Sequence, residues 1–454
     1  MVSPGFFAQE LRRGGVDFYA GVPDSLLKSF CAWLQDNIGP ASHIIAANEG
    51  AAVALAAGHY LASGRPGCVY MQNSGEGNAI NPLASLTDAD VYGIPVLLLI
   101  GWRGCPGVHD EPQHVKQGKV TLSLLETMGI PYSVLSADEA EVSSQIADVC
   151  RVLASGRTCA LVVRKDTFSK FELSGQTEYP KAENKGPWSS GQTEYPKADN
   201  KGPWPLDTLS DPVISTPDPV ISTLGSVIST PGSVISTEPE GRVEKSLSRE
   251  TAIQMVARAA GPSDVIVSST GMISRELFEF REAAGQGHER DFLTVGSMGH
   301  ANQIALGISL EKPGRRVWCF DGDGAVIMHM GSMATVGVKG KSNFVHVVFN
   351  NGAHDSVGGE PTVGLQIDLP GIARACGYRN VLSVSTEKEL LEALGSVIST
   401  LGSVISTEPE GRVEKSLCGP VFLEIKVRKG NRPDLGRPTT TPLQNRDAFM
   451  KFLK

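Results

Sequence analysis

Residues 315–354 read RRVWCFDGDGAVIMHMGSMATVGVKGKSNFVHVVFNNGAH, and this stretch decides the fold. The apolar run at 317–320 predicts a buried strand that ends in the turn Asp-Gly-Asp-Gly. Apolar residues with helical spacing follow, among them Met328, and the β-branched and aromatic run at 344–349 predicts a second buried strand. A strand, a helix and a strand form a crossover unit with parallel strands. The turn and the asparagines after the second strand therefore meet at one sheet edge, where open α/β sheets bind ligands.

The polar groups at this edge suit a hard cation that holds a diphosphate. Asp323 offers a carboxylate oxygen, and Asn350 and Asn351 offer amide oxygens. Mg²⁺ prefers about six oxygen ligands and takes part of them from phosphates and water. Gly322 and Gly324 let the backbone approach a ligand closely, and the N-terminus of the following helix favours an anion.

The spacing of the two motifs makes an ordinary turn a poor explanation. Twenty-five residues separate Gly324 from Asn350, between two predicted strands. The pattern resembles the motif of thiamin-diphosphate-dependent enzymes, in which GDG is followed at this distance by NN. The resemblance implies thiamin diphosphate and Mg²⁺ as cofactors. The metal ligands that it implies are Asp323, Asn351 and the backbone carbonyl of Ala353, and the diphosphate-binding residues are Gly322, Asp323, Gly324 and Ala325.

The composition is that of a globular protein of two or three domains. Among 454 residues, 41% are hydrophobic and 20% are charged. The formal net charge of −8 argues against nucleic acid or an anionic membrane as a partner. The eight cysteines form no CxxC pair, so the sequence predicts neither a zinc site nor a disulfide framework. Residues 1–20 carry no signal pattern and no apolar run reaches about 18 residues, so we expect a cytoplasmic protein.

Residues 1–170 are predicted to form the first α/β domain. Residues 18–24 are expected to be a strand that runs into a turn, and further strands are expected at 43–47, 68–72, 96–100 and 161–164. Helices are expected at 6–13, 25–37 and 49–62. The polar segment 73–78 is expected to be a loop. Alternating strands and helices imply a parallel sheet.

Residues 171–246 break this pattern and are predicted to be a long disordered repeat linker. SGQTEYPKAENKGPW at 174–188 recurs with one change at 190–204, and VIST units then follow in tandem. Pro, Gly, Ser and Thr dominate, so there is little to bury. The alternative is a β-solenoid, but that fold needs longer repeats without frequent proline. We expect a dispensable linker that proteases cut before either domain.

Residues 247–454 are predicted to form the second α/β domain. A near copy of the repeats, LGSVISTLGSVISTEPEGRVEKSL, returns at 394–417. We expect the repeat insert at 395–417 to be a surface excursion between a helix at 387–394 and a strand at 421–427. The predicted architecture is two parallel-sheet thiamin-diphosphate-binding domains, of the pyrimidine type and the diphosphate type, joined by the linker.

Thiazolium chemistry needs a carboxylate that relays a proton to the aminopyrimidine ring of the cofactor, and Glu49 is the candidate. It opens an Ala-rich helix within AANEGAAVALAAG, which contains no basic residue. An apolar setting raises the pKa of a carboxyl group, whereas a helix N-terminus lowers it. The alternative is a first-turn glutamate that only stabilises its helix. The Asn-Glu-Gly-Ala-Ala placement resembles the activating glutamate of the family.

Two further segments resemble cofactor contacts of the family. In GSMG at 296–299, Met298 would support both cofactor rings, and the carbonyl of Gly296 would accept a hydrogen bond from the pyrimidine amino group. The alternative for Met298 is core packing. In NSGEGN at 73–78, Glu76 stands where the family pattern has an apolar residue. The cofactor contacts that the resemblance implies in this loop are Gly75, Gly77 and Asn78.

Six longer motifs narrow the resemblance to the phosphonopyruvate decarboxylase family. They are FYAGVPDSLLK, MQNSGEGNAINPLASL, DEPQHVKQGKVT, DFLTVGSMGHA, NNGAHDSVGGEPTVG and DLGRPTTTP. The resemblance implies non-oxidative decarboxylation of 3-phosphonopyruvate to phosphonoacetaldehyde and CO₂ in phosphonate biosynthesis. It also implies a homo-oligomer with active sites at a subunit interface. A sulfopyruvate decarboxylase would share almost every motif, and a catalytically silent scaffold relative is the second alternative.

The remaining candidates are polar groups on predicted loops. Asp24 and His114 are candidates for proton transfer and substrate contacts. The alternative for His114 is a surface histidine. Four further residues could hold the phosphonate, and the sequence does not choose among them. They are Ser25, Lys28, Arg103 and His354.

Overall fold

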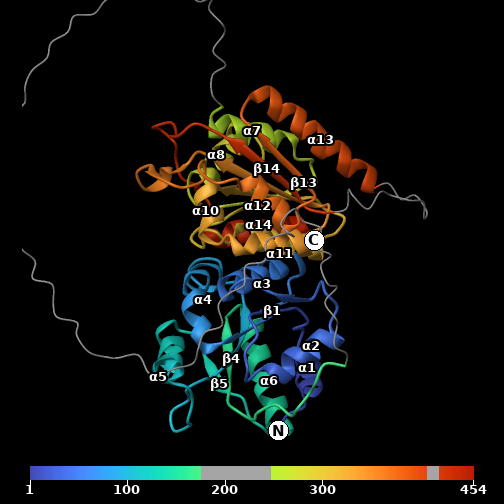
Figure 1. Ribbon diagram of the computed structural model, residues 1–454, viewed down its shortest axis with the longest axis vertical. Coiled ribbons are helices and arrows are strands. Elements are labelled where there is room, and N and C mark those ends of the chain that lie inside the picture. Colours follow the sequence, from blue (N-terminus) through green and yellow to red (C-terminus); the bar gives the residue numbers. More distant parts are fainter. Residues whose placement is uncertain (175–246, 406–418) are drawn as a thin grey trace, which may run out of the picture. The chain divides into compact units, whose positions relative to one another are not determined.

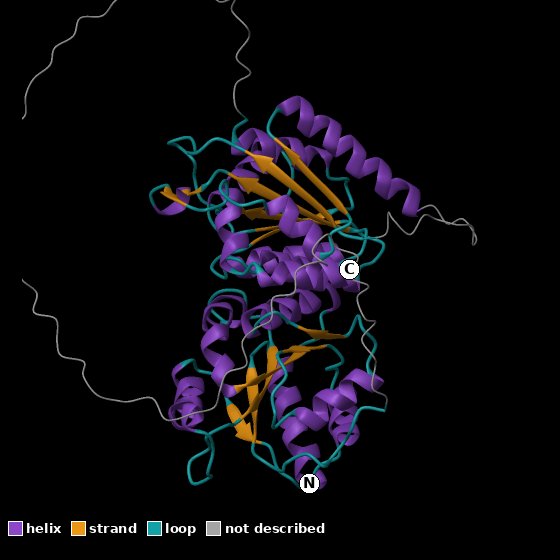
Figure 2. Cartoon of the chain, viewed as in Figure 1, coloured by secondary structure: helices purple, strands orange, loops and turns teal. Residues whose placement is uncertain are grey.

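The computed structural model describes residues 1–174, 247–405 and 419–454, which contain two parallel six-stranded sheets with helices packed on them (Figures 1 and 2). The predicted α/β class is therefore confirmed. The predicted linker from residue 175 on, and residues 406–417 of the predicted insert, lie outside the described residues. No described helix is long and apolar enough to cross a membrane.

The first sheet has the strand order β2-β1-β3-β4-β6-β5, with every pair parallel. Its strands are β1 (Tyr19–Gly21), β2 (His43–Ile45), β3 (Gly67–Gln72), β4 (Val96–Gly101), β5 (Tyr132–Val134) and β6 (Cys159–Val163). Its helices are α1 (Pro4–Arg13), α2 (Lys28–Asn37), α3 (Glu49–Ser63), α4 (Glu76–Pro82), α5 (Pro112–Thr127) and α6 (Glu139–Ala154). Two short helical turns, η1 (Asn73–Gly75) and η2 (Leu83–Thr87), flank α4. The predicted loop at 73–78 is therefore wrong, because the chain turns directly from β3 into η1 and α4.

The second sheet has the order β13-β14-β10-β9-β7-β8 and is also parallel throughout. Its strands are β7 (Val265–Ser268), β8 (Asp291–Leu293), β9 (Val317–Gly322), β10 (Phe344–Asn350), β13 (Asn380–Val384) and β14 (Val421–Lys426). Its helices are α7 (Arg249–Ala259), α8 (Met272–Ala283), α9 (Ala301–Glu311), α10 (Asp323–Met328), α11 (Gly331–Lys339), α12 (Leu369–Cys376), α13 (Glu387–Ile405) and α14 (Pro442–Leu453). A small hairpin after β10 contains β11 (Ala353–His354), η3 (Asp355–Val357) and β12 (Glu360–Pro361).

Residues 315–354 contain the two strands that the sequence predicts. β9 and β10 pair in parallel, starting with Val317 opposite Phe344. The prediction of one helix between them is wrong, because α10 ends before His329 and α11 begins after it. The break lets His329 stack on His300, with ring centroids 4.2 Å apart. Met328, expected on the apolar face, is 50% exposed.

Helix α13 corrects the prediction for the repeat insert. The helix does not end at Leu394 but continues through 395–405. Val397, from the first repeat unit of the insert, is 3% exposed and packs in the same core cluster as Leu390 and Leu394. Apolar residues three or four positions apart share one helix face, so this part of the insert continues the helix instead of leaving the domain.

Helices α3 and α9 pack closely because glycines lie at their contact. A Cβ at Gly58 would lie 2.1 Å from the carbonyl oxygen of Ile304, and a Cβ at Gly307 would lie 2.5 Å from that of Leu55. The two backbones can approach to this distance only where no side chain intervenes. This contact connects the helix that begins with Glu49 to the helix that follows the GSMG segment.

Replacing Gly58 by alanine is expected to destabilise the protein. The added methyl group would meet the backbone of α9, and overpacking of this kind costs about 1–3 kcal/mol. Gly395→Ala is the matched control. A Cβ at this glycine of α13 meets nothing within 4 Å, so helix propensity should raise the free energy of unfolding by up to about 1 kcal/mol. Denaturant midpoints measure both effects. An unchanged midpoint for Gly58→Ala would contradict the close α3–α9 contact.

Candidate active site

The residues predicted to bind the diphosphate and the metal come together at the carboxyl edge of the second sheet. Segments after β7, β9 and β10 surround a small cavity of about 50 Å³. We call it the diphosphate-side cavity. The predicted site residues that line it are Met298, Gly322, Asp323, Gly324, Ala325, Asn351 and Ala353.

Asp323 is a buried carboxylate without an ion-pair partner among the described residues. Its side chain is 1% exposed, and its Oδ2 accepts a hydrogen bond from the hydroxyl of Thr362. Burial raises the pKa of this carboxyl, and the hydrogen bonds oppose the shift. A buried charge needs compensation. A carboxylate, an amide oxygen and a backbone carbonyl on one cavity are the oxygen donors that Mg²⁺ prefers, so these residues fit the metal that the resemblance implies.

Asn351 is positioned by a chain of buried charges. Its Nδ2 donates to Asp355 Oδ2 at 2.7 Å, and the same oxygen accepts from Arg249 Nη1 at 2.5 Å. Arg249 also donates two hydrogen bonds of 2.9 Å to the carboxylate of Glu276. Arg249 and Glu276 are 5% and 2% exposed, so this network is shielded from solvent. Such a network holds the Asn351 amide in one orientation.

The neighbouring asparagine, Asn350, forms its hydrogen bonds inside the protein core. Asn350 is fully buried, and its Nδ2 donates to Glu424 Oε1 at 2.7 Å and to the carbonyl of Gly364 at 2.8 Å. Of the two asparagines, it is Asn351 that lines the cavity.

His354 also lines the diphosphate-side cavity. A Cβ at Gly324 would lie 2.4 Å from His354 Cε1, so the imidazole ring lies directly on the glycine. The other three candidates for the phosphonate line a different cavity, at the first sheet. They are Ser25, Lys28 and Arg103. The structure thus separates His354 from them.

Sequence reasoning missed several residues that line the diphosphate-side cavity. Ser269 and Thr270 lie between β7 and α8, next to the GDG turn because β7 pairs with β9. The polar run SSTG after an apolar strand was the available signal. Arg249 gave no signal, because its contact with Asp355 joins positions that are far apart in the sequence.

Glu49 is the first residue of α3 and is 8% exposed. Asn48 caps this helix with a side-chain hydrogen bond of 2.8 Å. Glu49 Oε2 accepts from Asn78 Nδ2 at 2.8 Å. Gly75 lies so close that a Cβ there would be 2.3 Å from Glu49 Oε1. The structure therefore brings Gly75 and Asn78 to the glutamate, whereas Gly77 is exposed and a Cβ there would meet nothing within 4 Å.

The GSMG segment meets the first domain beside these residues. Gly296 has a φ of +70°, and a Cβ there would lie 2.8 Å from Ser85 Cβ. Ser297 Oγ lies 2.6 Å from Ser85 Oγ. A Cβ at Gly50 would lie 2.9 Å from the ring of His300. The GSMG segment thus touches the part of the same chain that carries Glu49.

Asp24 lies on a loop, as predicted, but His114 does not. Asp24 is 5% exposed, and its carboxylate accepts hydrogen bonds of 2.8 Å from Gln72 Nε2 and from the backbone N–H of Leu26. His114 lies in the first turn of α5, which begins at Pro112 because proline suits the first helical position. It lines neither the diphosphate-side cavity nor the cavity at Ser25.

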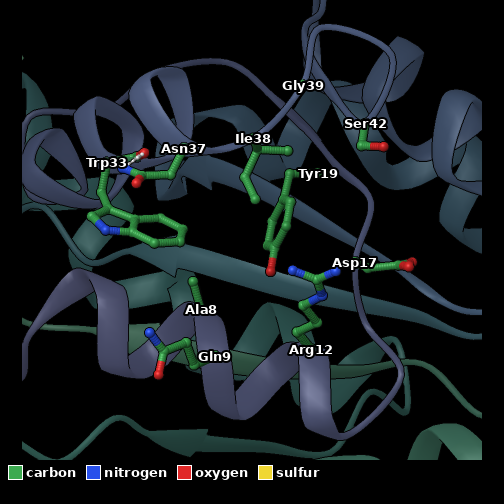
Figure 3. A pocket seen from close by; sticks show the side chains of 10 residues that line it. All are labelled: Ala8, Gln9, Arg12, Asp17, Tyr19, Trp33, Asn37, Ile38, Gly39 and Ser42. Carbon is green, nitrogen blue, oxygen red and sulfur yellow. Dashed lines mark hydrogen bonds between the residues drawn. The ribbon is translucent and has the colours of Figure 1, made fainter.

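A cavity of about 410 Å³ lies at the opposite edge of the first sheet (Figure 3). Its walls include Asp17 and Ser42, which precede β1 and β2, and Arg12 and Trp33 from α1 and α2. None of the predicted site residues lines it. Because open α/β sheets bind ligands at the carboxyl edge, we place this cavity outside the candidate site.

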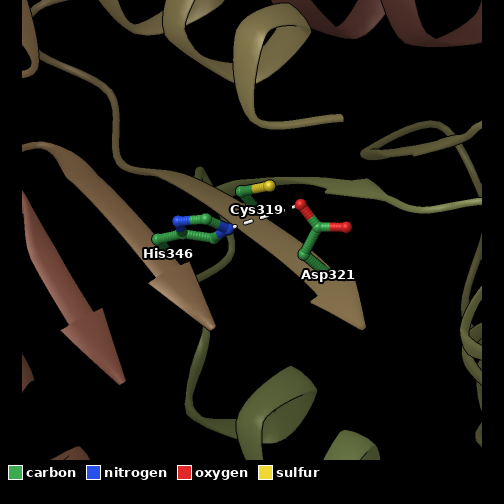
Figure 4. A group of neighbouring side chains, drawn as sticks. All are labelled: Cys319, Asp321 and His346. Atoms are coloured by element: carbon green, nitrogen blue, oxygen red, sulfur yellow. Dashed lines mark hydrogen bonds and ion pairs between the residues drawn. The ribbon is translucent and has the colours of Figure 1, made fainter. Parts of the chain in front are cut away.

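Cys319, Asp321 and His346 form a buried group on β9 and β10 (Figure 4). Their ligand atoms lie within 4.8 Å of one another, as a metal site would require. Both ring nitrogens of His346 are engaged, however. Nδ1 lies 3.0 Å from the hydroxyl of Tyr378, and Nε2 lies 3.4 Å from Asp321 Oδ2. Burial also raises the pKa of the Cys319 thiol well above its ordinary value, so we assign the group to the core.

Glu76, the departure from the family pattern, is buried beside Gly75. It is 3% exposed, its Oε2 accepts from Gln117 Nε2 at 3.0 Å, and its Oε1 has no hydrogen-bond partner in the described structure. Gln117 Nε2 also donates to the carbonyl of Asn73 at 2.7 Å, which ties α5 to η1 beside Glu49. Burial raises the pKa of Glu76 to about 7.

Comparisons with known proteins show the family of the chain. The N-terminal binding domain of thiamine pyrophosphate enzymes matches residues 5–124, and the C-terminal binding domain matches residues 267–406. The phosphonopyruvate decarboxylases of Streptomyces viridochromogenes and Streptomyces hygroscopicus are 31% and 30% identical to the chain. The matches cover 97% and 96% of this chain and 92% and 90% of theirs. The chain belongs to the thiamine pyrophosphate enzymes and, within them, to the family of the phosphonopyruvate decarboxylases. It is a thiamine-pyrophosphate-dependent carboxy-lyase.

Two further comparisons match the separate subunits of a relative and a solved structure. The alpha and beta subunits of sulfopyruvate decarboxylase from Methanococcus maripaludis are 40% and 32% identical, over 28% and 31% of this chain and 73% of each subunit. The crystal structure of benzoylformate decarboxylase from Polynucleobacter necessarius superposes with a TM-score of 0.62 at 14% identity. It covers 95% of this chain and 100% of that one, a likeness of fold alone.

Replacing Glu76 by glutamine is expected to change how stability depends on pH. The folded protein holds the Glu76 proton up to about pH 7, whereas the unfolded chain releases it near the ordinary value of 4.5. The free energy of unfolding therefore falls as the pH rises through this window, by up to about 3 kcal/mol, because the unfolded chain releases the proton first. Glu76→Gln should gain stability over the wild type across the same window. Glu392→Gln, an exposed change on α13, is the control. Denaturant midpoints from pH 5 to pH 8 measure the difference, and parallel curves for Glu76→Gln and wild type would contradict the assigned burial.

Proposed function

We propose that the protein catalyses non-oxidative decarboxylation of 3-phosphonopyruvate to phosphonoacetaldehyde and CO₂, as a step of phosphonate biosynthesis. The similarity to two phosphonopyruvate decarboxylases over nearly the whole chain carries this choice of substrate. The catalytic arrangement is supported by the meeting of Asp323, Asn351 and Ala353 at one cavity. A catalytically silent relative has no need to keep this donor set together with Glu49.

The residues of the diphosphate-side cavity would hold the cofactor and the metal. Asp323, Asn351 and the carbonyl of Ala353 would bind Mg²⁺, and the backbone at Gly322–Ala325 would face the diphosphate. The network from Glu276 through Arg249 to Asp355 keeps the Asn351 amide in place. When bound, thiamin diphosphate supplies the electron sink for the carbon–carbon bond that breaks as CO₂ leaves.

Glu49 would hold and move a proton at its Oε1. This oxygen lies against Gly75, whereas Oε2 is occupied by the amide of Asn78. Exclusion of water by burial would strengthen the interaction of this carboxyl with a bound ring nitrogen. Asp24, held by Gln72 at the same sheet edge, is the proposed residue for proton transfer to the product.

Sulfopyruvate is the second candidate substrate. The two subunits of the Methanococcus maripaludis enzyme resemble parts of this chain at 40% and 32% identity, which makes the sulfonate a chemically close alternative. The two substrates share the 2-oxo acid that reacts and differ in the charged group at the far end.

The test of function is aldehyde release from phosphonopyruvate and from sulfopyruvate by the cofactor-loaded protein. We expect a higher kcat/KM for phosphonopyruvate. Glu49→Gln should lower kcat at least about tenfold, a barrier rise of about 1.4 kcal/mol or more, because the amide cannot relay the proton. Its cofactor affinity should stay that of the wild type. Preferred turnover of sulfopyruvate would replace the proposed substrate, and full activity of Glu49→Gln would remove Glu49 from the mechanism.

Asp323→Ala is expected to abolish Mg²⁺-dependent binding of thiamin diphosphate, because it removes the charged member of the proposed ligand set. Titration of cofactor binding by tryptophan fluorescence at several Mg²⁺ concentrations measures this. Asp368→Ala is the matched control, since Asp368 is an exposed cap of α12 outside the cavity. Equal cofactor affinity of Asp323→Ala and wild type at low Mg²⁺ would place the metal elsewhere.

We further propose a homo-oligomer in which Glu49 of one subunit faces the diphosphate-side cavity of another. The family resemblance supports this arrangement, and so does the split of the Methanococcus maripaludis enzyme into subunits. The alternative is a site completed within one chain, which the contact between Gly296 and Ser85 favours.

Mixing Glu49→Gln and Asp323→Ala proteins decides between the two arrangements. A shared site should recover activity after subunit exchange, because one kind of hybrid site then holds both intact residues. A mass measurement of mixed oligomers confirms the exchange. Exchange without recovered activity would show that each chain completes its own site.

A further inference from the structure

The carboxyl edge of the first sheet holds a cavity of about 640 Å³ that neither the cofactor nor the metal explains. Segments after β1, β4 and β6 line it, so it opens on the edge where parallel sheets bind ligands. Three of the four residues that could hold a phosphonate lie in its wall, namely Ser25, Lys28 and Arg103. We call it the first-sheet cavity.

Two of the cations in the wall are already neutralised. Arg103 donates to Asp110 through Nε at 2.8 Å and through Nη2 at 2.5 Å, and its Nη1 donates to Ser25 Oγ at 2.8 Å. Lys170 Nζ lies 2.7 Å from Glu172 Oε1. Each of these two carboxylates offsets the charge of its cation.

Three further side-chain cations in the wall form no ion pair, although the Glu172 carboxylate interacts electrostatically with one of them, Lys28. Among the described residues, no carboxylate lies within ion-pair distance of Lys28, Arg164 or Lys165. The guanidinium of Arg164 lies 5.6 Å from the centre of the Trp102 ring, which leaves its N–H groups available. Asp166 is the lining carboxylate that forms no ion pair in the described chain, and its negative charge offsets one of these three positive charges. The cavity therefore carries an excess of positive charge.

A path of neighbouring residues and hydrogen bonds runs from this cavity to Glu49. Ser25 in the wall follows Asp24, whose Oδ1 accepts from Gln72 Nε2 at 2.8 Å. Gln72 Oε1 accepts from Ser74 Oγ at 2.7 Å, and the next residue packs on the Glu49 carboxylate. The cavity and Glu49 therefore lie at the same carboxyl edge of the first sheet, joined through Asp24, Gln72 and Ser74.

We propose that the first-sheet cavity binds the charged end of the substrate, and that Lys28, Arg164 and Lys165 are specificity-determining residues for a doubly negative phosphonate. Three cations against one carboxylate match a dianion better than a singly charged sulfonate. Arginine and lysine are the residues that bind phosphonate-like oxyanions through charge-assisted hydrogen bonds. This inference rests on the proposed function, because it takes the 2-oxo acid to react at Glu49.

Methylphosphonate, which cannot react, probes the cavity in the cofactor-loaded protein. Lys28→Met and Arg164→Gln should each weaken its binding about tenfold or more. They should raise KM for phosphonopyruvate by a similar factor and change kcat little, as loss of uniform binding predicts. The effect on sulfopyruvate should be smaller, because one charge is lost from the ligand as well. Lys341→Met, at an exposed lysine before β10, is the control and should change neither quantity.

The outcomes separate this inference from the proposed function. If the wild type turns over phosphonopyruvate but Lys28→Met, Arg164→Gln and Lys165→Met all keep its KM, the cavity assignment is overturned and the function stands. If the wild type does not turn over phosphonopyruvate, the function fails, and methylphosphonate binding still judges the cavity. Weaker binding in the variants supports the anion site, and unchanged binding overturns it. Unchanged melting temperatures confirm that these exposed substitutions leave the fold intact.

Discussion

The close contact of α3 and α9 is the constraint on which the candidate site depends. Two glycines, Gly58 and Gly307, let carbonyl oxygens of one helix meet the backbone of the other. Helices at this distance cannot slide without a steric clash. The contact therefore fixes the start of α3, where Glu49 lies, relative to the GSMG segment before α9. This contact holds Glu49 in one position, as proton transfer over a single hydrogen-bond length requires, whichever chain supplies the facing cavity.

At the carboxyl edges of both sheets, buried carboxylates are held by hydrogen bonds from neutral amides or hydroxyls. Asp323 is held by Thr362, and Glu49 by Asn78. Neutral donors fix the position of a carboxylate without neutralising it. The other carboxylate oxygens then stay available to a ligand. Charged partners are used behind the site. Arg249 pairs with Glu276 and also donates to Asp355, and Asp355 in turn holds the Asn351 amide.

The sequence predicted those parts of the structure that local pattern controls. The strands around GDG and NN were predictable because continuous apolar runs and glycine turns mark them. The break at His329 was not, because it depends on stacking against His300. The helical setting of His114 could have been read from Pro112, a recognised helix start. Arg249 could not have been found, since its partner Asp355 lies far along the chain.

In the candidate site, too, features set by local sequence pattern were predictable and those set by tertiary contacts were not. The meeting of Asp323, Asn351 and Ala353 at one cavity was predictable because their spacing in the sequence is itself the motif. The cations Arg164 and Lys165 were missed, because the segment after β6 reaches the wall of the first-sheet cavity only in the folded protein. Sequence alone named Lys28 but could not group it with them.

The burial of Val397 on α13 has a consequence for how the gene can change. The repeat LGSVIST is seven residues long, and seven residues make nearly two full helical turns, with a drift of only about 20°. Each copy added in frame to this helix would return its apolar residues to nearly the same side. Duplication in units of seven is thus a mutation that the fold can absorb as added helix length, whereas a unit of five or six would rotate every later residue away from the core.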